Sequence, residues 1–513
     1  MEIPVQYEEA VVLKKLFVSV ALLGLLVPTA NAQDAQGVLR AAASAMGNPS
    51  EVRSIQYSGA GWVAAVGQSF SPIDDWPRFE ITSYARTIEY PTRSSREELT
   101  RRQGSYPTTG GGGTPLQGEQ RQVLVTSGNY AWNMNGNDAA PQPALADFRQ
   151  LDLLMSPHGF LGAALAAKDA TAVALVLEGR PMTMVSFTAL NKYRINGTIN
   201  EKNLVERTQT WVANPVFGDM IYDHRFTDYK AFGNIMFPSV IHSHQGDPAI
   251  HPGHNVMEIR VTNAQANAAA PALTVPPNVQ KAALPAVQVA STQLANGVWR
   301  VAGGSHHSVA VEFSDFVAVV EAPQSEARSL AVIAEVRKLI PKKPIRYVVN
   351  THHHFDHSGG LRTYVAQSAT VVTHEANRDF YTNVAFHPGT RTLEPDVLSS
   401  RMPWFAGNRV PAFETVTQKY VISDGVRTLD IYPVRGLQHA NTMLVAYLPT
   451  ERILINADLY APPASGAPAP APSPSTRALA NTIQQLKLNV ERHVGIHGEV
   501  GSHQDFVKAS GTN

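Results

Sequence analysis

Alternating apolar and polar positions dominate the chain between about residues 78 and 265. This period-two spacing is typical of strands with one buried face, and Asn-Gly, Gly-Asn or proline-containing turns separate the runs. The pattern predicts a meander of long antiparallel strands. The runs are RFEITSYARTIEY (78–90), RQVLVTSGNYAW (121–132), MTMVSFTAL (182–190), KYRINGTIN (192–200), NLVERTQTWVA (203–213), GDMIYDHRFTDYKAF (218–232) and NVMEIRVTNAQ (255–265).

Two segments among these strands have helical character, VLRAAASAMG (38–47) and LDLLMSPHGFLGAALAAK (151–168). A strand meander with one or two packed helices predicts an α+β N-terminal domain. The stretch GSYPTTGGGGTP (104–115) predicts a flexible loop, and it lacks the Gly-Lys-Ser/Thr of a phosphate-binding loop. The histidine-rich stretch HSHQGDPAIHPGH (242–254) predicts an exposed hairpin, because no carboxylate cluster accompanies it.

A proline-spaced segment, residues 271–288, separates this region from one with a different pattern. Beyond it, short apolar strands alternate with helical segments, which predicts an α/β layered domain. The predicted organisation is an export segment (1–32), an N-terminal domain (33–277), a linker (278–297) and a C-terminal domain (298–513). The C-terminal helical segments are 325–340, 359–368 and 475–490.

The N-terminus has the features of a signal peptide. Lys14 and Lys15 precede an apolar run, and Ala30-Asn31-Ala32 offers small residues for cleavage after Ala32. A membrane anchor is the alternative, but the run is short for a spanning helix. We therefore expect a periplasmic or secreted protein without a stable membrane anchor.

The composition excludes several classes of partner and of catalytic site. The 42 basic and 42 acidic residues cancel, so no overall field favours nucleic acid or anionic membranes, and we expect a small-molecule substrate. The chain contains no cysteine, which excludes disulfides, thiolate metal ligands and a cysteine nucleophile. It gives no indication of the oligomeric state.

The most informative stretch is THHHFDHSGG (351–360), which follows the apolar strand IRYVVN. It contains the pattern H-x-H-x-D-H, formed by His352, His354, Asp356 and His357. Side chains alternate as they leave a strand, so the first two histidines can hold one ion. The aspartate and the third histidine of the pattern can reach a second ion. Such ligands suit zinc first, with iron or manganese as substitutes.

A zinc site needs further ligands, and three more donors follow at predicted strand ends. His439 lies on a turn before an apolar strand, Asp458 ends the strand RILINAD, and His497 precedes a glycine after HVGI. A lone histidine is more often structural than metal-binding. The order of these donors after the H-x-H-x-D-H pattern makes them candidate ligands.

These motifs resemble those of the metallo-β-lactamase superfamily of zinc hydrolases. THHHFDHSGG, GLQHANTMLVAYLP and INADLY are each similar to a family signature. The resemblance implies an αββα sandwich over roughly 298–506. It also implies a first zinc ion on His352, His354 and His439, a second on Asp356, His357 and His497, and Asp458 bridging them. Two positions depart from the family, with Glu321 in place of a supporting aspartate and Ala457 in place of glycine.

The resemblance implies hydrolysis of an ester, lactone, thioester or amide. Two zinc ions that share a water lower its pKa from 15.7 to about 7, and the resulting hydroxide attacks the carbonyl. Asp356 and Asp458 are the expected catalytic residues. Asp356 is also expected to accept the proton of the attacking water. His306, His307 and Tyr460 are candidate substrate contacts.

Two alternatives remain. One is a β-lactamase of the cysteine-free type, although Asp458 favours lactonases and esterases. The other is a carrier of apolar ligands, because residues 210–241 resemble the half-barrels of periplasmic lipoprotein carriers.

Overall fold

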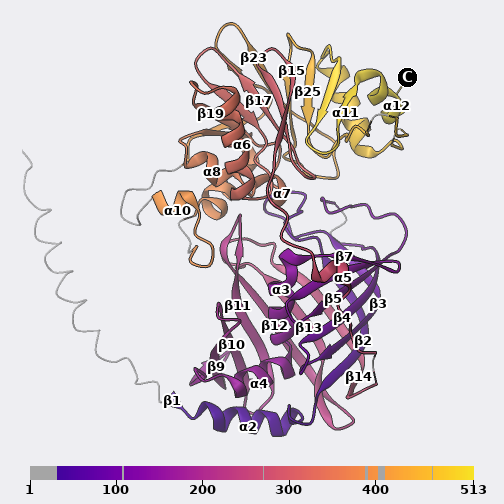
Figure 1. Ribbon diagram of the computed structural model, residues 1–513, viewed down its shortest axis with the longest axis vertical. Coiled ribbons are helices and arrows are strands. Elements are labelled where there is room, and N and C mark those ends of the chain that lie inside the picture. Colours follow the sequence, from indigo (N-terminus) through magenta and orange to yellow (C-terminus); the bar gives the residue numbers. More distant parts are fainter. Residues whose placement is uncertain are drawn as a thin grey trace, which may run out of the picture.

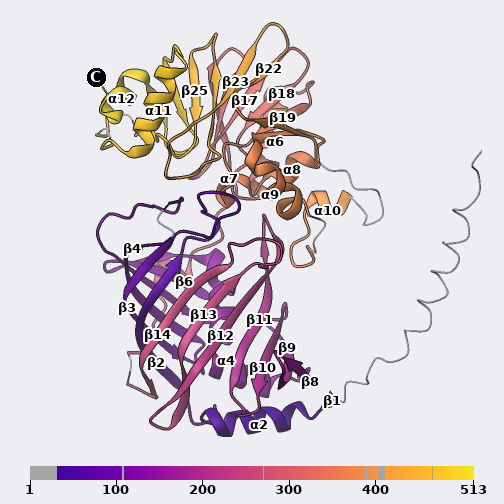
Figure 2. The same ribbon diagram turned by 180° about the vertical axis from the view of Figure 1, so that it is seen from behind.

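Within the described residues, fourteen antiparallel strands form one curved sheet in the N-terminal domain (Figures 1 and 2). The computed structural model describes residues 32–106, 109–269, 271–387, 391–401, 411–464, 466–468 and 470–512. The export segment predicted for residues 1–32 lies outside this range except for Ala32. The strands, in sheet order, are β1 (Ala32–Gln33), β8 (Thr171–Leu177), β9 (Arg180–Ala189), β10 (Tyr193–Asn200), β11 (Val205–Asn214), β12 (Gly218–Phe232), β13 (Ile235–Gln245), β14 (Asn255–Ala266), β2 (Ser54–Ala64), β3 (Arg78–Glu89), β4 (Ser94–Gln103), β5 (Gln120–Ser127), β6 (Tyr130–Asn135) and β7 (Asp138–Pro141).

Three helices pack on this sheet, α2 (Ala35–Met46), α3 (Ala146–Leu154) and α4 (Pro157–Ala166). Helix α4 begins after Ser156, because the side chain of Ser156 accepts a hydrogen bond from the Gly159 N–H and proline occupies the first helical position. Phe160 and Leu161 are fully buried between helix and sheet. The predicted meander is confirmed in this β-rich α+β domain, and the helical segment predicted for 151–168 is two helices, because Ser156 and Pro157 start a new one.

Two sheets packed face to face form the C-terminal domain. The core between them consists of alternate side chains such as Val309, Val311, Ile431 and Leu444. The first sheet contains β15 (Ala290–Ala295), β16 (Val298–Ala302), β17 (Ser308–Glu312), β18 (Val317–Val320), β19 (Ile345–Val349), β20 (Thr370–His374) and β21 (Phe413–Val416). The second contains β22 (Tyr420–Ser423), β23 (Thr428–Pro433), β24 (Leu444–Leu448), β25 (Ile453–Asn456), β26 (Arg492–Gly495) and β27 (Val500–Ser502).

Helices cover the outer face of each sheet, so the predicted αββα arrangement is confirmed (Figure 1). Val332 and Val336 of α6 pack on the first sheet, and Leu479 and Phe506, from α11 and α12, pack on the second. The helices are α6 (Glu326–Leu339), α7 (Phe355–Ser358), α8 (Leu361–Val365), α9 (Arg378–Phe380), α10 (Val397–Arg401), α11 (Pro474–Gln485) and α12 (His503–Ser510).

The linker is shorter than the sequence predicts. Helix α5 (Pro277–Gln280) packs on the N-terminal sheet through Val279, and β15 already pairs with β16 from Ala290 onward. Only about residues 281–289 therefore connect the two domains. Within the described residues, no helix has the length and apolar character needed to cross a membrane.

Candidate metal centre

The histidine-rich stretch directly follows β19, as predicted. His352 and His354 point to one side, while His353 points elsewhere, its Nδ1 lying 2.8 Å from Thr442 Oγ1. Helix α7 then begins at Phe355 and carries Asp356 and His357. The alternation expected for residues leaving a strand is therefore present here.

The first group of candidate ligands contains His352, His354, His439 and Asp458, whose donor atoms all lie within 4.8 Å of one another. Nε2 of His352 lies 2.9 Å from Nδ1 of His354. Asp458 Oδ2 lies 3.1 Å from His352 Nε2 and 3.2 Å from His439 Nε2. His352 and His439 thus face one carboxylate oxygen, and His354 faces His352.

The second group contains Asp356, His357, His497 and also His306. Nε2 of His357 lies 3.2 Å from Nε2 of His497 and 3.7 Å from Asp356 Oδ2. His306 Nε2 lies 3.2 Å from the same oxygen of Asp356. His306 was expected as a substrate contact, and the structure places it among the candidate ligands.

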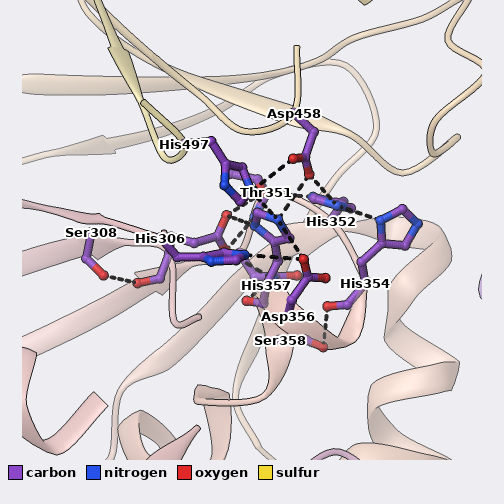
Figure 3. Close-up of polar contacts among 12 residues, drawn as sticks. His306, Ser308, Thr351, His352, His354, Asp356, His357, Ser358, Asp458 and His497 are labelled. Carbon is purple, nitrogen blue, oxygen red and sulfur yellow. Dashed lines mark hydrogen bonds and ion pairs between the residues drawn. The ribbon is translucent and has the colours of Figure 1, made fainter. Parts of the chain in front are cut away.

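Asp458 lies between the two groups (Figure 3). Its Oδ2 is also 3.0 Å from His357 Nε2, and its Oδ1 is 3.0 Å from His497 Nε2. The carboxylate therefore contacts imidazoles of both groups, as a bridging ligand would. Its backbone has a positive φ of 57°, a conformation that aspartate tolerates better than most residues.

The pKa shifts of the histidines differ between the two groups. Burial and the neighbouring histidines hold the pKa of His352 and His354 well below the usual value, so both imidazoles stay neutral, as metal ligands must. Burial alone would lower the pKa of His357, but the carboxylates of Asp458 and Glu321 raise it well above its usual value. Burial alone would raise the pKa of Asp458, but the surrounding imidazoles lower it strongly, so this carboxylate is ionised.

The donor set fits divalent metal ions. Imidazole nitrogens face each other at 2.9 Å in the first group and at 3.2 Å in the second, an arrangement that a shared cation stabilises. Nε2 of His439 is buried and faces Asp458 Oδ2 at 3.2 Å. Nitrogen and carboxylate donors without sulfur suit zinc, and also iron or manganese.

Glu321 contacts His357 of the second group on the side of the ring that faces away from the other candidate ligands. It stands at the position where the resembled family usually has aspartate. It is fully buried, its Oε2 lies 3.2 Å from His357 Nδ1, and it accepts hydrogen bonds from Asn350 and Thr351. A carboxylate that accepts the outer N–H of a ligand histidine fixes the tautomer and orientation of the ring. The longer side chain therefore fills the supporting role.

Two candidate substrate contacts lie elsewhere. His307 accepts a hydrogen bond from Gly303 N, and burial lowers its pKa to about 4. The ring of Tyr460 packs edge-on against His493 and Phe506, within the core beneath α12. Neither belongs to the two groups, because local packing holds both side chains.

The 242–254 hairpin is also more buried than predicted. His244 lies 2.9 Å from the Asp223 carboxylate, and His251 lies 2.6 Å from the Pro72 carbonyl oxygen. The expectation of an exposed hairpin holds for residues 248–250 at its tip and is wrong for His244 and His251, which neighbouring strands and the 67–76 loop cover.

The comparisons with known proteins agree with this geometry. Residues 301–494 match the family model described as the metallo-beta-lactamase superfamily. The C-terminal region is a metallo-β-lactamase-superfamily domain. The chain thus contains a metal-dependent hydrolase domain.

Individual relatives are distant. The 2,4-dinitroanisole O-demethylase subunit alpha of Nocardioides sp. (strain JS1661) is 24% identical over 163 residues, which are 31% of this chain and 43% of that protein. The match therefore spans less than half of that relative. The metallo-beta-lactamase from Pontibacter korlensis is 19% identical, with 44% of this chain and 98% of that chain covered and a TM-score of 0.34. The mono-zinc form of FIM-1 from Pseudomonas aeruginosa is 20% identical, with 44% and 96% covered and a TM-score of 0.31.

Sequence reasoning missed two residues that the structure places at the centre, Gln68 and Ser69. Both lie in the N-terminal domain, between β2 and β3, more than 280 positions from their contacts. No local motif marks them. His306 carried a signal, because it lies in a turn next to the expected site.

Proposed function

We propose that the protein is an exported dinuclear zinc hydrolase that cleaves an ester, lactone, thioester or amide. The observation that carries the proposal is the position of Asp458 between the two ligand groups. Its two oxygens lie 3.0 to 3.2 Å from four imidazole nitrogens, one oxygen serving both groups. A carboxylate in this place supports two ions held close together.

When bound, two such ions polarise the carbonyl and lower the pKa of a water. The chain supplies the geometry around them. Asp458 offsets the repulsion between two cations, and the buried imidazoles of His352 and His354 provide neutral donors in fixed orientations. Asp356 is the proton-handling group, because 40% of its side chain is exposed and its Oδ2 faces the second group.

The exposure of the ligands indicates the direction of substrate entry. His352, His354 and His357 are fully buried, whereas the side chains of Asp356 and His497 are 40% and 26% exposed. The substrate therefore approaches over the second group. The carbonyl carbon would meet the water between the groups, with Asp356 Oδ2 able to accept the proton and return it to the leaving atom.

The carrier alternative gains little support from the N-terminal domain. Side chains of the domain itself, including Phe160, Leu161 and Phe237, fill its core. A cavity of about 20 Å³ beside Asp152 and His224 has room for about one water. An apolar ligand would need to displace this packing.

The test is metal analysis of the purified protein together with chromogenic esters, lactones, thioesters, amides and β-lactams. We expect hydrolysis of an ester or lactone well above that of His352→Ala, abolished by a chelator. Hydrolysis of β-lactams alone would replace this proposal with the β-lactamase alternative. A fully zinc-loaded protein that cleaves none of these classes would refute it.

A further inference from the structure

A short segment of the N-terminal domain reaches the metal centre. The segment contains Gly67, Gln68, Ser69 and Phe70 and lies between β2 and β3, and we refer to it as the 67–70 segment. Figures 1 and 2 show the loops at this end of the N-terminal sheet turned toward α7 of the C-terminal domain. The Gly67 carbonyl accepts a hydrogen bond from the Phe355 N–H, the first residue of α7.

Gln68 holds the carboxylate of Asp356. Its Nε2 donates a hydrogen bond of 2.8 Å to Asp356 Oδ1, which leaves Oδ2 toward His306 and His357. The Gln68 amide is itself oriented, because its Oε1 accepts a hydrogen bond from the Gly112 N–H at 2.9 Å. The donor end of the amide therefore faces the carboxylate.

The Ser69 carbonyl fixes the tautomer of His354. His354 Nε2 lies 2.9 Å from this oxygen, which can only accept. The ring must therefore carry its proton on Nε2 and keep the lone pair on Nδ1, the atom that faces His352. The hydroxyl of Ser69 also lies 3.2 Å from His353 Nε2.

The N-terminal domain also holds the turn that carries His439. Asn441 N–H donates to the Phe70 carbonyl at 2.9 Å, and Gly110 N–H donates to the Gln438 carbonyl at 2.8 Å. These bonds flank His439 on both sides. Backbone groups of the N-terminal domain thus fix the position of a third candidate ligand.

The 67–70 segment is firmly attached to its own domain. Gly111 N–H donates to the Gln68 carbonyl, and His251 bonds to the Pro72 carbonyl. On the other side, the Phe355 ring packs against Trp76 and Phe217 with centroids 6.3 and 5.3 Å away. The segment therefore has a fixed position relative to the N-terminal sheet, and it holds the candidate ligands in that position.

We propose that the N-terminal domain is a structural part of the metal centre, with Gln68 and the Ser69 carbonyl acting as positioning groups for Asp356 and His354. The two domains then form one hydrolase rather than a hydrolase with an attached carrier. The inference rests on the proposed function only in taking these groups as metal ligands. It assigns a role to a domain that has no ligand of its own in either group.

The first test is the substitution Gln68→Met, which keeps the length of the side chain and removes its donor. The matched control is Gln56→Met at an exposed position of β2 in the same domain. Zinc affinity of the full-length protein is measured by competition with a chromophoric chelator, and cobalt spectra report the ligand geometry. We expect the second ion to bind about tenfold or more weakly while the first is unchanged, because outer partners contribute that much to ligand orientation. Unchanged binding of both ions in Gln68→Met would overturn the role of Gln68.

A second variant tests the segment as a whole. Gly67 has φ +75°, and a Cβ there would lie 2.3 Å from Cγ of Phe355, so Gly67→Ala must displace the segment from α7. The control is Gly179→Ala, where φ is +76° and nothing lies within 4 Å. It carries the same backbone strain without the clash.

We expect Gly67→Ala to weaken both ions and Gly179→Ala to weaken neither. Equal zinc affinities in the two variants would refute the proposal. If the protein binds only one zinc ion, the comparison still tests the segment, because the Ser69 carbonyl contacts His354 of the first group. Zinc affinity is read without substrate, so a failure to hydrolyse carbonyl compounds would count against the proposed function alone.

Discussion

Oε2 of Glu321 lies 3.2 Å from Nδ1 of His357, and both side chains are fully buried. The contact leaves His357 Nε2 to face Asp458 and His497. Glu321 directly follows β18 and has a positive φ of 77°, a strained conformation for glutamate. Strained backbone of this kind persists where surrounding structure enforces it, often at functional sites.

The first prediction concerns this contact. Glu321→Gln keeps the size of the side chain but removes the charge, and the new amide either presents a donor to His357 Nδ1–H or loses its bond to Thr351. We expect zinc affinity of the second group to fall by about 10- to 100-fold, the usual cost of losing such a partner. Chelator competition measures it, with the exposed Glu201→Gln as control. Equal affinities in the two variants would contradict the supporting role.

Metal removal gives the second prediction. We expect close to two zinc ions per chain by elemental analysis, with activity lost to a chelator and restored by zinc. His352→Ala should lose metal, because Nε2 of this residue belongs to the first group. His353→Ala should keep most of it, because His353 bonds to Thr442 and Ser69 instead. Equal metal loss in both variants would show that the alternation is misassigned.

The sequence predicted the layers, the H-x-H-x-D-H stretch and the later donors, because these depend on local patterns. Strand periodicity marks the faces of a sheet, and a ligand pattern at a strand end marks one edge of it. Tyr460 shows the limit of this reasoning. It follows Asp458 by two positions, yet packing against His493 and Phe506 directs its ring into the core beneath α12.

Contacts between the two domains could not be predicted from the sequence, for a different reason. Gln68 has no motif, and its partner Asp356 is 288 positions away. Only the docking of the two domains brings the pair together. Glu321 was visible as a departure from the family, but its reach to His357 depends on the backbone conformation at the end of β18.

Export is the third prediction. Cleavage after Ala32 would leave Gln33 as the mature N-terminus, so N-terminal sequencing of protein from the periplasmic fraction should begin at or near this residue. Ala32 and Gln33 form the edge strand β1, which pairs with Val173 and Ala172 of β8. Mature, membrane-bound material that retains Lys14 and Lys15 would support the anchor alternative instead.

The fourth prediction concerns acid stability of the N-terminal domain. His158 is buried in α4, where burial lowers its pKa to about 4 although the bond to the Met46 carbonyl opposes this shift. An unfolded chain takes up this proton below about pH 6.5. Between these values the unfolded state binds more protons, so the free energy of unfolding falls by up to about 1.4 kcal/mol for each unit that the pH decreases.

Urea unfolding at pH 7 and pH 5 measures this effect. His158→Gln retains a donor for the Met46 carbonyl and cannot titrate, so its loss of stability between the two pH values should be smaller than that of the unmodified protein. The comparison cancels the pH dependence of metal binding, which both proteins share. An identical pH dependence in both would mean that His158 takes up its proton over the same pH range in the folded and the unfolded chain.

The last prediction concerns Asp458, which contacts both ligand groups. Removing its carboxylate should weaken the second group more than the first. The first keeps three imidazoles, a sufficient zinc set, and two of them are fully buried on the short stretch that follows β19. The second combines Asp356 and His357 of one helical turn with His306 and His497 from two distant loops, and the side chains of Asp356 and His497 are 40% and 26% exposed. Asp458→Ala should therefore bind about one zinc ion and lose about a hundredfold or more in turnover if both ions stabilise the transition state.

The positive φ of Asp458 requires a control, because alanine is strained there and asparagine is not. Asp458→Asn keeps the shape and the backbone preference while removing the charge, so any deficit that it shares with Asp458→Ala comes from the lost carboxylate. Asp458→Ser imitates the arrangement of cysteine-free β-lactamases. Elemental analysis and turnover decide the matter. If Asp458→Ser keeps two zinc ions and full activity, Asp458 does not bridge, and the β-lactamase alternative becomes the better account of the site.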